Sequence, residues 1–280
     1  MLTKSQLVAL FAEYGFRPLK RFGENYLVDR NVKDVIIEAA GIVASDTVLE
    51  IGPGFGALTM DIAASGAELI AVEKDRKAFE ILRGLAGDSL PNARFINGDI
   101  LELDLKKIAG RGRIKIIGNL PYYITSPIIE YLIRNKDHIS SALVTVQREV
   151  ANRLLAGPGT KDYSSISCFV RYHTNPVYIR TIKRASFYPV PDVDSSLIKL
   201  QMLDKPPVDV RDEGLFFRIV RGAFNQRRKT IVNSLSRKAV LDMPKEKLSG
   251  ILKSVDIEPS VRPESLGLSD FAKIANAVKA

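Results

Sequence analysis

The sequence contains a single cysteine, Cys168, among its 280 residues. One thiol excludes an internal disulfide framework and a zinc site built from several cysteines, and it is typical of a reducing compartment. The chain also lacks a run of about 18 apolar residues, which a membrane span requires. Because no signal-peptide pattern is found at the N-terminus either, we expect a cytoplasmic protein without a membrane segment and without a bound metal.

Acidic residues are in the minority, with 32 Asp and Glu against 41 Lys and Arg. The resulting net charge of +9 and pI of about 9.5 favour a polyanionic partner such as nucleic acid. A generally basic enzyme has the same composition, so charge alone leaves both interpretations open.

The order of apolar and amphipathic stretches predicts an α/β fold. Short apolar runs alternate with helical patterns up to about Val150, which is typical of βαβ units and a parallel sheet. A helix is expected over 30–40, capped by Asp29. The predicted strands are 47–51, 68–73, 94–96, 114–117 and 142–147, and three β-rich runs at 165–170, 177–182 and 196–202 are expected at the far edge of the same sheet.

Regular β structure is expected to stop at Lys205-Pro206-Pro207, after which apolar residues recur with helical spacing. We therefore predict two domains. Residues 1–205 form a Rossmann-like catalytic domain with an N-terminal extension, and residues 206–280 form a small all-helical domain.

A glycine-rich turn follows the first predicted strand. Gly52 and Gly54, in the segment Glu50 to Gly56, permit a tight turn and close approach of the backbone to a ligand. Glu73 ends the second predicted strand 21 residues after Gly52, where an acidic side chain can accept both hydroxyls of a ribose. Asp99 follows the third strand, where it can accept from an adenine amine.

Two other interpretations of this turn stay open: a dinucleotide oxidoreductase and a purely structural glycine turn. The spacing Gly52-Pro-Gly54-Phe-Gly56 departs from G-x-G-x-x-G. The step Gly98-Asp99 has no required part in that fingerprint, and both features weigh against the oxidoreductase.

The tetrapeptide Asn119-Leu120-Pro121-Tyr122 follows the fourth predicted strand. Adenine N6 is a poor nucleophile because its lone pair is delocalised, so a catalyst must orient it with hydrogen-bond acceptors. The side-chain carbonyl of Asn119 and the backbone carbonyl of Leu120 can do so. Pro121 would restrict the backbone of this tetrapeptide, and Tyr122 can stack on an extruded base. A simple turn is the alternative, since Asn and Pro are common turn formers.

A second aromatic candidate is Phe187, which precedes the stiff loop containing Pro189 and Pro191. The loop could hold Phe187 against the other face of the base. Alternatively, Phe187 belongs to the hydrophobic core.

Taken together, these motifs resemble the small-subunit rRNA adenine N6,N6-dimethyltransferase family, bacterial branch, over nearly the whole chain. The resemblance lies in residues 20–29, 50–59, 73, 98–99, 119–122, 187–195, 224–230 and 262–266. The sequence departs from the family at Glu24, where Gln is expected, and at Tyr26, where Phe is usual. A carboxylate cannot donate as an amide does, so the role of position 24 is open.

The resemblance implies a Rossmann-like S-adenosylmethionine-dependent methyltransferase with a helical cap. It implies cofactor contacts from Asn25, Leu27, Gly52, Glu73, Asp99 and Asn119, to which the glycine turn adds Gly54. The family dimethylates two adjacent adenosines in a hairpin loop near the 3′ end of 16S rRNA. Its substrate is presented within an immature small ribosomal subunit, and the enzyme is a monomer.

The stretch from Arg218 to Lys238 contains seven basic residues and no acidic one. On a helix continuing through it, one face would carry Arg218, Arg221, Asn225 and Arg228. Such a face can track phosphates, although an ordinary solvated face is the alternative. The residues that we assign to RNA binding are Arg221, Arg227, Arg228 and Lys229.

Other functions remain as hypotheses. A large-subunit rRNA adenine methyltransferase of the antibiotic-resistance type shares the Asn-Leu-Pro-Tyr step, although the segment 224–230 argues against it. From a different class, the chain could act mainly as a non-catalytic ribosome-assembly factor. The retained Gly52, Glu73, Asp99 and Asn119 favour catalysis.

Overall fold

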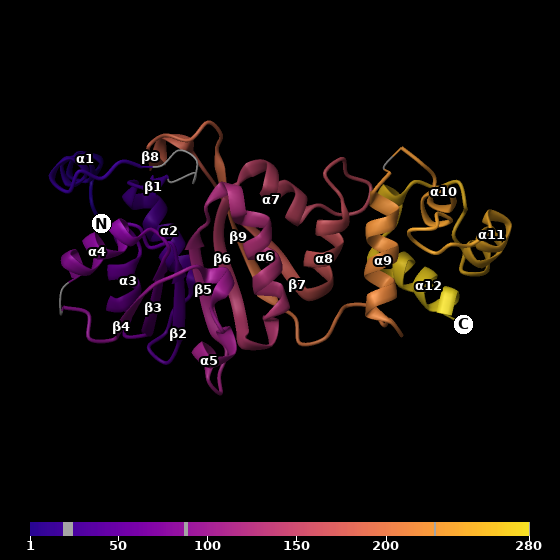
Figure 1. Cartoon of the computed structure of the whole chain (residues 1–280), viewed down its shortest axis with the longest axis horizontal. Coiled ribbons are helices and arrows are strands. Elements are labelled where there is room, and N and C mark those ends of the chain that lie inside the picture. The colour runs from indigo at the N-terminus through magenta and orange to yellow at the C-terminus, as the bar shows by residue number, and fades with distance from the viewer. Residues whose placement is uncertain (19–24, 87–88, 227, 280) are drawn as a thin grey trace. The chain divides into compact units, whose positions relative to one another are not determined.

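The computed structural model describes residues 1–18, 25–86, 89–226 and 228–279. The chain divides into two compact units (Figure 1). The first comprises Met1–Ala151 and Pro176–Met202, and the second comprises Asn152–Asn175 and Leu203–Ala280. The division near Met202 lies close to the predicted boundary at 205. Residues 152–175, which we assigned to the catalytic domain, instead belong to the helical unit.

A seven-stranded sheet with the order β4-β3-β2-β5-β6-β9-β7 forms the centre of the first unit. The first five of these strands pair in parallel, and β9 pairs antiparallel with β6. Because the carboxyl ends of parallel strands meet at one edge, the residues that end β2, β3, β4 and β5 come together there. The strands are β2 (Thr47–Ile51), β3 (Glu68–Glu73), β4 (Ala93–Asn97), β5 (Ile114–Asn119), β6 (Ile139–Gln147), β7 (Thr174–Ile182) and β9 (Ser195–Met202).

The five strands predicted before about Val150 are confirmed, as are the runs at 177–182 and 196–202. The helix over 30–40 is confirmed as α2 (Arg30–Ala40), and Asp29 accepts hydrogen bonds from the backbone of Asn31 and Val32. β5 extends two residues beyond the predicted strand, so that Asn119 is its last residue and does not follow it.

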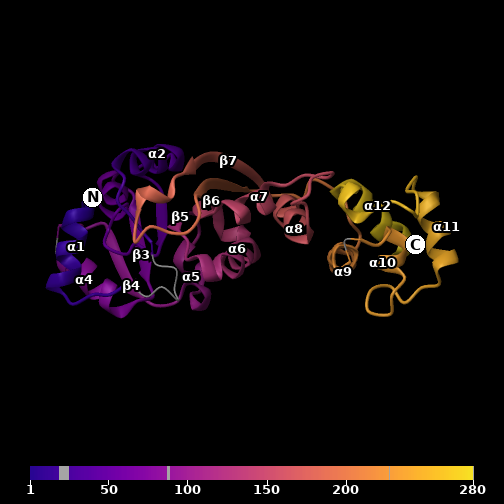
Figure 2. The same ribbon diagram turned by 90° about the horizontal axis from the view of Figure 1, so that it is seen from above.

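Helices cover both faces of the sheet, which explains why the central strands are almost continuously apolar. Val32 and Ile36 of α2 pack with Ile62 of α3 and with Val48 of β2 on one face. Figure 2 shows α6 on the side of the sheet opposite α2. The helices after α2 in this part of the chain are α3 (Thr59–Ala64), α4 (Arg76–Ala86), α5 (Leu105–Ala109), α6 (Thr125–Arg134) and α7 (Arg148–Leu155). Short 3₁₀ turns are η2 (Ile100–Glu102), η3 (Tyr122–Ile124), η4 (Lys136–His138) and η5 (Arg184–Ser186).

A two-stranded sheet joins the N-terminal segment to the loop around Phe187. β1 (Tyr26–Leu27) pairs antiparallel with β8 (Phe187–Tyr188), with Leu27 opposite Phe187. The hydroxyl of Ser186 donates to Asp29 Oδ2 at 2.8 Å, which reinforces the connection. Next to it, α1 (Lys4–Glu13) contributes to an apolar cluster that includes Phe55 of the glycine turn. Residues far apart in sequence thus support the turn together.

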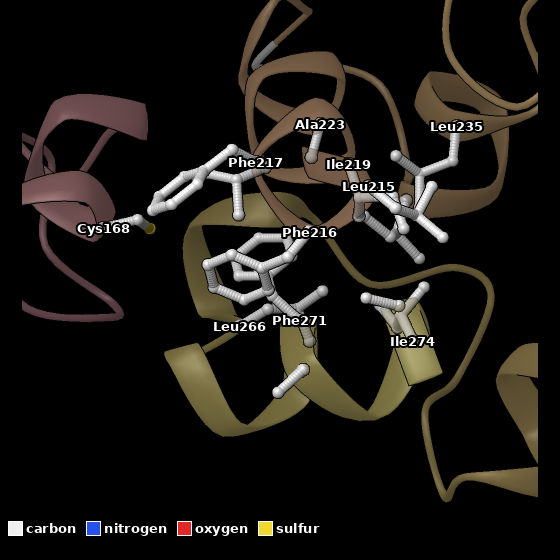
Figure 3. Packing of buried hydrophobic residues seen from close by; sticks show 14 of the residues in the cluster. Cys168, Leu215, Phe216, Phe217, Ile219, Ala223, Leu235, Leu266, Phe271 and Ile274 are labelled. Carbon is white, nitrogen blue, oxygen red and sulfur yellow. The ribbon is translucent and has the colours of Figure 1, made fainter. Parts of the chain in front are cut away.

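The second unit is helical around its own core. Figure 3 shows Cys168 of α8 (Ser165–His173) pointing toward Phe217 of α9 (Glu213–Phe224), and Phe271 of α12 (Leu268–Lys279) beneath α9. The unit also contains α10 (Ile231–Leu235), α11 (Lys245–Ser254) and η6 (Pro263–Ser265).

Two expectations for this unit are wrong. The run 165–170 is helical, because Ser164 and Ser167 form a capping box and because Cys168 and Tyr172, four residues apart, share a buried face. The basic helix also does not continue to Arg228, since α9 ends at Phe224 with Asn225 as its C-cap. Arg228 therefore lies in the connection to α10 and not on the face of α9.

Candidate functional site: a nucleotide cavity at the strand ends

The glycine turn directly follows β2. Gly52, Gly54 and Gly56 all have positive φ angles, of 65°, 55° and 81°. A Cβ at Gly54 would lie 2.8 Å from Cδ1 of Tyr26, so only glycine fits there. The backbone N–H of Gly54 donates to Glu73 Oε2 at 3.0 Å, which ties the turn to the end of β3.

A fully buried carboxyl lies behind the turn. Glu50 in β2 is 2% exposed and accepts a hydrogen bond from Thr59 at 2.8 Å. Burial raises the pKa of Glu50 to about 8, and the charge of Glu73 adds to this rise, while the Thr59 hydroxyl opposes it. Glu50 is therefore largely protonated at neutral pH.

Asp99 is held in place at the end of β4. Its Oδ2 accepts from Lys74 Nζ at 2.7 Å, and its Oδ1 accepts from the backbone N–H of Leu101 at 3.0 Å. Burial acts to raise the pKa of Asp99, but Lys74 and the backbone hydrogen bond outweigh it, so that the pKa is lowered. The carboxylate is consequently ionised and able to accept from a ligand.

The tetrapeptide ends β5 at the same edge of the sheet. Asn119 Nδ2 donates to the backbone carbonyl of Asn25 at 2.7 Å, and Leu120 N–H donates to the carbonyl of Thr145 at 3.1 Å. The amide nitrogen of Asn119 is thus committed to the protein, which leaves its Oδ1 as an acceptor. Pro121 has φ −60° and ψ 130°, a φ that its ring fixes.

Tyr122 is half-buried, and its hydroxyl forms a 2.8 Å hydrogen bond with Ser195 Oγ. Burial raises the pKa of Tyr122, although the Ser195 contact opposes this. The tyrosine stays neutral, and its ring orientation is fixed at the start of β9.

The glycine turn, Glu73, Asp99, Asn119 and Pro121 line one cavity of about 280 Å³, whereas Leu120 and Tyr122 are not among its lining residues. All but one of the predicted cofactor residues line it: Asn25, Gly52, Gly54, Glu73, Asp99 and Asn119. The cavity also has apolar walls from Ile100, Ile124 and Ile128.

Leu27, the remaining predicted cofactor residue, lies elsewhere. Leu27 and Phe187 are buried together in an apolar cluster and line a smaller cavity of about 40 Å³, which also borders Asn119. The ring of Phe187 is 2% exposed, and the side chain of Leu120 is buried as well. Stacking of Phe187 on a base stays a prediction, and it requires the ring to become exposed.

Sequence reasoning missed several residues of the larger cavity, among them Tyr26, Lys74 and Tyr123. Lys74 and Tyr123 could have been found from the sequence, because each directly follows a predicted site residue, Glu73 or Tyr122. Tyr26 was noted only as a departure from the family.

The predicted RNA-binding residues lie in the helical unit. Arg221 is exposed on α9, and Arg228 and Lys229 are exposed in the connection to α10. Arg227 lies outside the described residues, as do Lys20, Arg21, Gly23 and Glu24 of the N-terminal segment that carries the family resemblance. Within the described part of the chain, no group of His, Cys, Asp or Glu side chains could hold a metal ion. None of the helices found there is long and apolar enough to cross a membrane.

The fold and the site define a class. A Rossmann-like sheet presents a glycine turn, acidic residues at two strand ends, and Asn119 and Pro121 of the tetrapeptide to one nucleotide-sized cavity, as in S-adenosylmethionine-dependent methyltransferases. Residues 15–277 match the family described as "Ribosomal RNA adenine dimethylase". The chain belongs to this family.

Two relatives with the same name are similar to this chain over nearly its whole length. The chain is 42% identical to the "Ribosomal RNA small subunit methyltransferase A" of Moorella thermoacetica, over 99% of this chain and 98% of that protein. The protein of the same name from Pelotomaculum thermopropionicum is 41% identical, over 96% and 94%.

Among solved structures, the dimethyladenosine transferase from Plasmodium falciparum has a TM-score of 0.78 at 26% identity, covering 89% of this chain and 95% of that one. The 23S rRNA methyltransferase ErmE has a TM-score of 0.72 at 23% identity, covering 91% and 100%, and is similar in fold.

Proposed function

We propose that this chain transfers methyl groups from S-adenosylmethionine to N6 of two adjacent adenosines in a hairpin loop near the 3′ end of 16S rRNA, giving N6,N6-dimethyladenosines. Its substrate is the rRNA within an immature small ribosomal subunit, and the modification contributes to subunit biogenesis. The protein acts in the cytoplasm as a monomer. The observation that supports this proposal most strongly is that Glu73, Asp99 and Asn119 line one cavity.

The residues around this cavity fit the cofactor. Glu73 can accept the ribose hydroxyls, Asp99 can accept from the adenine amine, and isoleucine side chains provide an apolar slot for the purine. The bound cofactor supplies an electrophilic methyl group on a sulfonium. No side chain of the protein has to form a covalent bond.

The tetrapeptide orients the target amine. Asn119 Oδ1 and the carbonyl of Leu120 accept from its two N–H groups, which favours the pyramidal form that attacks. Asn25 holds the amide of Asn119 through the 2.7 Å hydrogen bond, so the acceptor is in place before the substrate binds. The proton leaves only after the amine has been alkylated, so orientation rather than general-base catalysis is the main contribution.

Tyr122 supports the flipped base by stacking, with Ser195 fixing its ring. Leu27 and Phe187, paired across β1 and β8, form the wall behind Asn119, and a shift of this strand pair would bring Phe187 toward the base.

The proposal is tested by incubating the full chain with labelled S-adenosylmethionine and either unmethylated small subunits or large subunits, followed by mapping of the modified nucleotides. Label on two adjacent adenosines of 16S rRNA is expected. Label on 23S rRNA would favour the antibiotic-resistance type of enzyme. Stable binding to small subunits without transfer would favour an assembly factor.

Replacement of Gly54 by alanine is expected to weaken S-adenosylmethionine binding at least about tenfold. The left-handed conformation costs an L residue roughly 1–2 kcal/mol. In addition, the new Cβ meets Tyr26 at 2.8 Å on the wall of the cavity. Isothermal titration calorimetry measures the effect.

Gly41→Ala is the matched control. Gly41 has nearly the same φ, 57°, but a Cβ there has no atom within 4 Å, and α2 ends away from the cavity. This variant should bind the cofactor as the wild type does. Equal binding by both variants would show that close approach at Gly54 is unimportant.

We further propose that the helical unit binds rRNA phosphates through Arg221, Arg227, Arg228 and Lys229. The double variant Arg228→Ala/Lys229→Ala is expected to weaken small-subunit binding and to reduce the slope of log affinity against log salt by about 2, one for each lost contact. Filter binding between low and moderate salt measures this slope.

Lys245→Ala/Lys247→Ala removes the same charge from exposed positions on α11 of the same unit. This control should leave the slope close to that of the wild type. An equal loss of slope in the two double variants would mean that net charge, rather than a defined surface, determines binding.

A further inference from the structure

The adenine end of the cavity contains an ion pair that the proposed function does not use. Lys74 directly follows Glu73, and its ammonium lies 2.7 Å from Asp99 Oδ2. The other carboxylate oxygen is committed to the backbone of Leu101. Since an ionised carboxylate has about four lone-pair sites, Asp99 can still accept from a ligand while both contacts persist. Lys74 thus fixes the orientation of Asp99 rather than blocking it.

An aromatic ring lies next to this ion pair. Tyr123 is in η3, directly after the tetrapeptide, and it lines the same cavity while the residue is 46% exposed. Asp99 is the main cause of the raised pKa of Lys74, and the phenol of Tyr123 also contributes, which indicates that the two side chains are neighbours. The apolar walls from Ile100 and Ile124 lie along the same cavity.

We propose that Tyr123 and Lys74 form the purine clamp of the cofactor cavity: Tyr123 covers one face of the adenine, and Lys74 positions the Asp99 carboxylate for the adenine amine. The inference rests on the proposed use of S-adenosylmethionine. Tyr123 is a binding residue and Lys74 a positioning residue, because Lys74 acts through Asp99.

An exposed tyrosine beside a lysine also fits a stacked RNA nucleotide and its phosphate. Two observations favour the cofactor. The charge of Lys74 is already paired with Asp99, and both side chains line the cavity that holds Glu73 and Gly54.

The first test measures binding of S-adenosylhomocysteine to the full chain without RNA. Tyr123→Ala is expected to weaken it about tenfold, because base–aromatic stacking is worth roughly 1–3 kcal/mol. Tyr123→Phe keeps the ring and should bind as the wild type does. Stacking on the ring does not depend on the adenine amine. Tyr123→Ala should therefore weaken binding of the 6-deamino analogue of S-adenosylhomocysteine by the same factor.

The second test separates Lys74 from general charge effects. Lys74→Met keeps the apolar stem and should lower the preference for S-adenosylhomocysteine over its 6-deamino analogue by about 2- to 5-fold, as expected for a partly exposed ion pair. Arg76→Met removes a charge from the same rim, where Arg76 is 84% exposed and paired with Glu80. This control should leave the preference unchanged.

Unchanged cofactor affinity in Tyr123→Ala, together with a raised KM for the small subunit, would overturn the clamp and assign Tyr123 to RNA. A loss of preference that is equal in Lys74→Met and Arg76→Met would overturn the role of Lys74. These outcomes leave the proposed function intact. In contrast, failure of the wild type to bind S-adenosylhomocysteine would contradict both.

Discussion

Asn119→Ala should lower the single-turnover rate of methyl transfer by about 10²–10³-fold, the usual effect of removing one preorganised hydrogen-bonding group from a reacting centre. The substitution removes the Oδ1 acceptor and also the hydrogen bond from Nδ2 to Asn25. Binding to small subunits should survive, since the predicted RNA contacts lie in the helical unit. The rate is measured with labelled S-adenosylmethionine in excess over unmethylated small subunits.

Asn119→Asp separates the two functions of this amide. A carboxylate retains an acceptor for the amine but cannot donate to the carbonyl of Asn25. We expect this variant to be slow, yet faster than Asn119→Ala. Full dimethylation by Asn119→Ala would refute the orienting role, and a loss of particle binding would show that the variant is misfolded.

Glu50→Gln should stabilise the protein at alkaline pH by roughly 3–5 kcal/mol, since each pKa unit corresponds to about 1.36 kcal/mol. The folded-state pKa is about 8, against an ordinary value of 4.5. Below pH 4.5 both states hold the proton. Between 4.5 and about 8 only the folded state does, so the wild-type free energy of unfolding falls as pH rises through this window. The glutamine is neutral throughout and can still accept from Thr59.

Urea unfolding at pH 5 and pH 8.5 measures this difference. The two proteins should be nearly equal at the lower pH and diverge at the higher one. Glu68→Gln, at an exposed position that begins the neighbouring strand, is the matched control and should retain the wild-type pH dependence. Parallel pH profiles for Glu50→Gln and the wild type would mean that Glu50 ionises readily inside the fold.

The half of the sheet that forms the site could be predicted because β2, β3 and β5 are short, largely apolar runs that end just before Gly52, at Glu73 and at Asn119. The helix α8 could not, because Ser165 to Val170 is short and β-branched or polar enough to suit a strand. Its helical state depends on the cap at Ser164 and on the burial of Cys168 and Tyr172 against helices from the far end of the chain. Such tertiary contacts override local propensity.

In the site, sequence order located the residues that end strands, since topology alone brings Gly52, Glu73, Asp99 and Asn119 to one edge. Residues placed by side-chain contacts were missed. The pairing of Lys74 with Asp99 depends on the register of β3 and β4, in which Glu73 lies opposite Asn97. The burial of Phe187 likewise depends on pairing with a segment about 160 residues earlier, which no local pattern records.

The helical unit is discontinuous, because the chain enters it after Ala151, leaves it after Asn175 and returns after Met202. A chain that stopped near residue 205 would retain α8 without its partners, and Tyr163, Cys168 and Tyr172 would face water. Such a fragment should aggregate rather than behave as an isolated catalytic domain. Exchange of the whole unit for another therefore requires crossovers at all three junctions of this chain, and not a single one near residue 203.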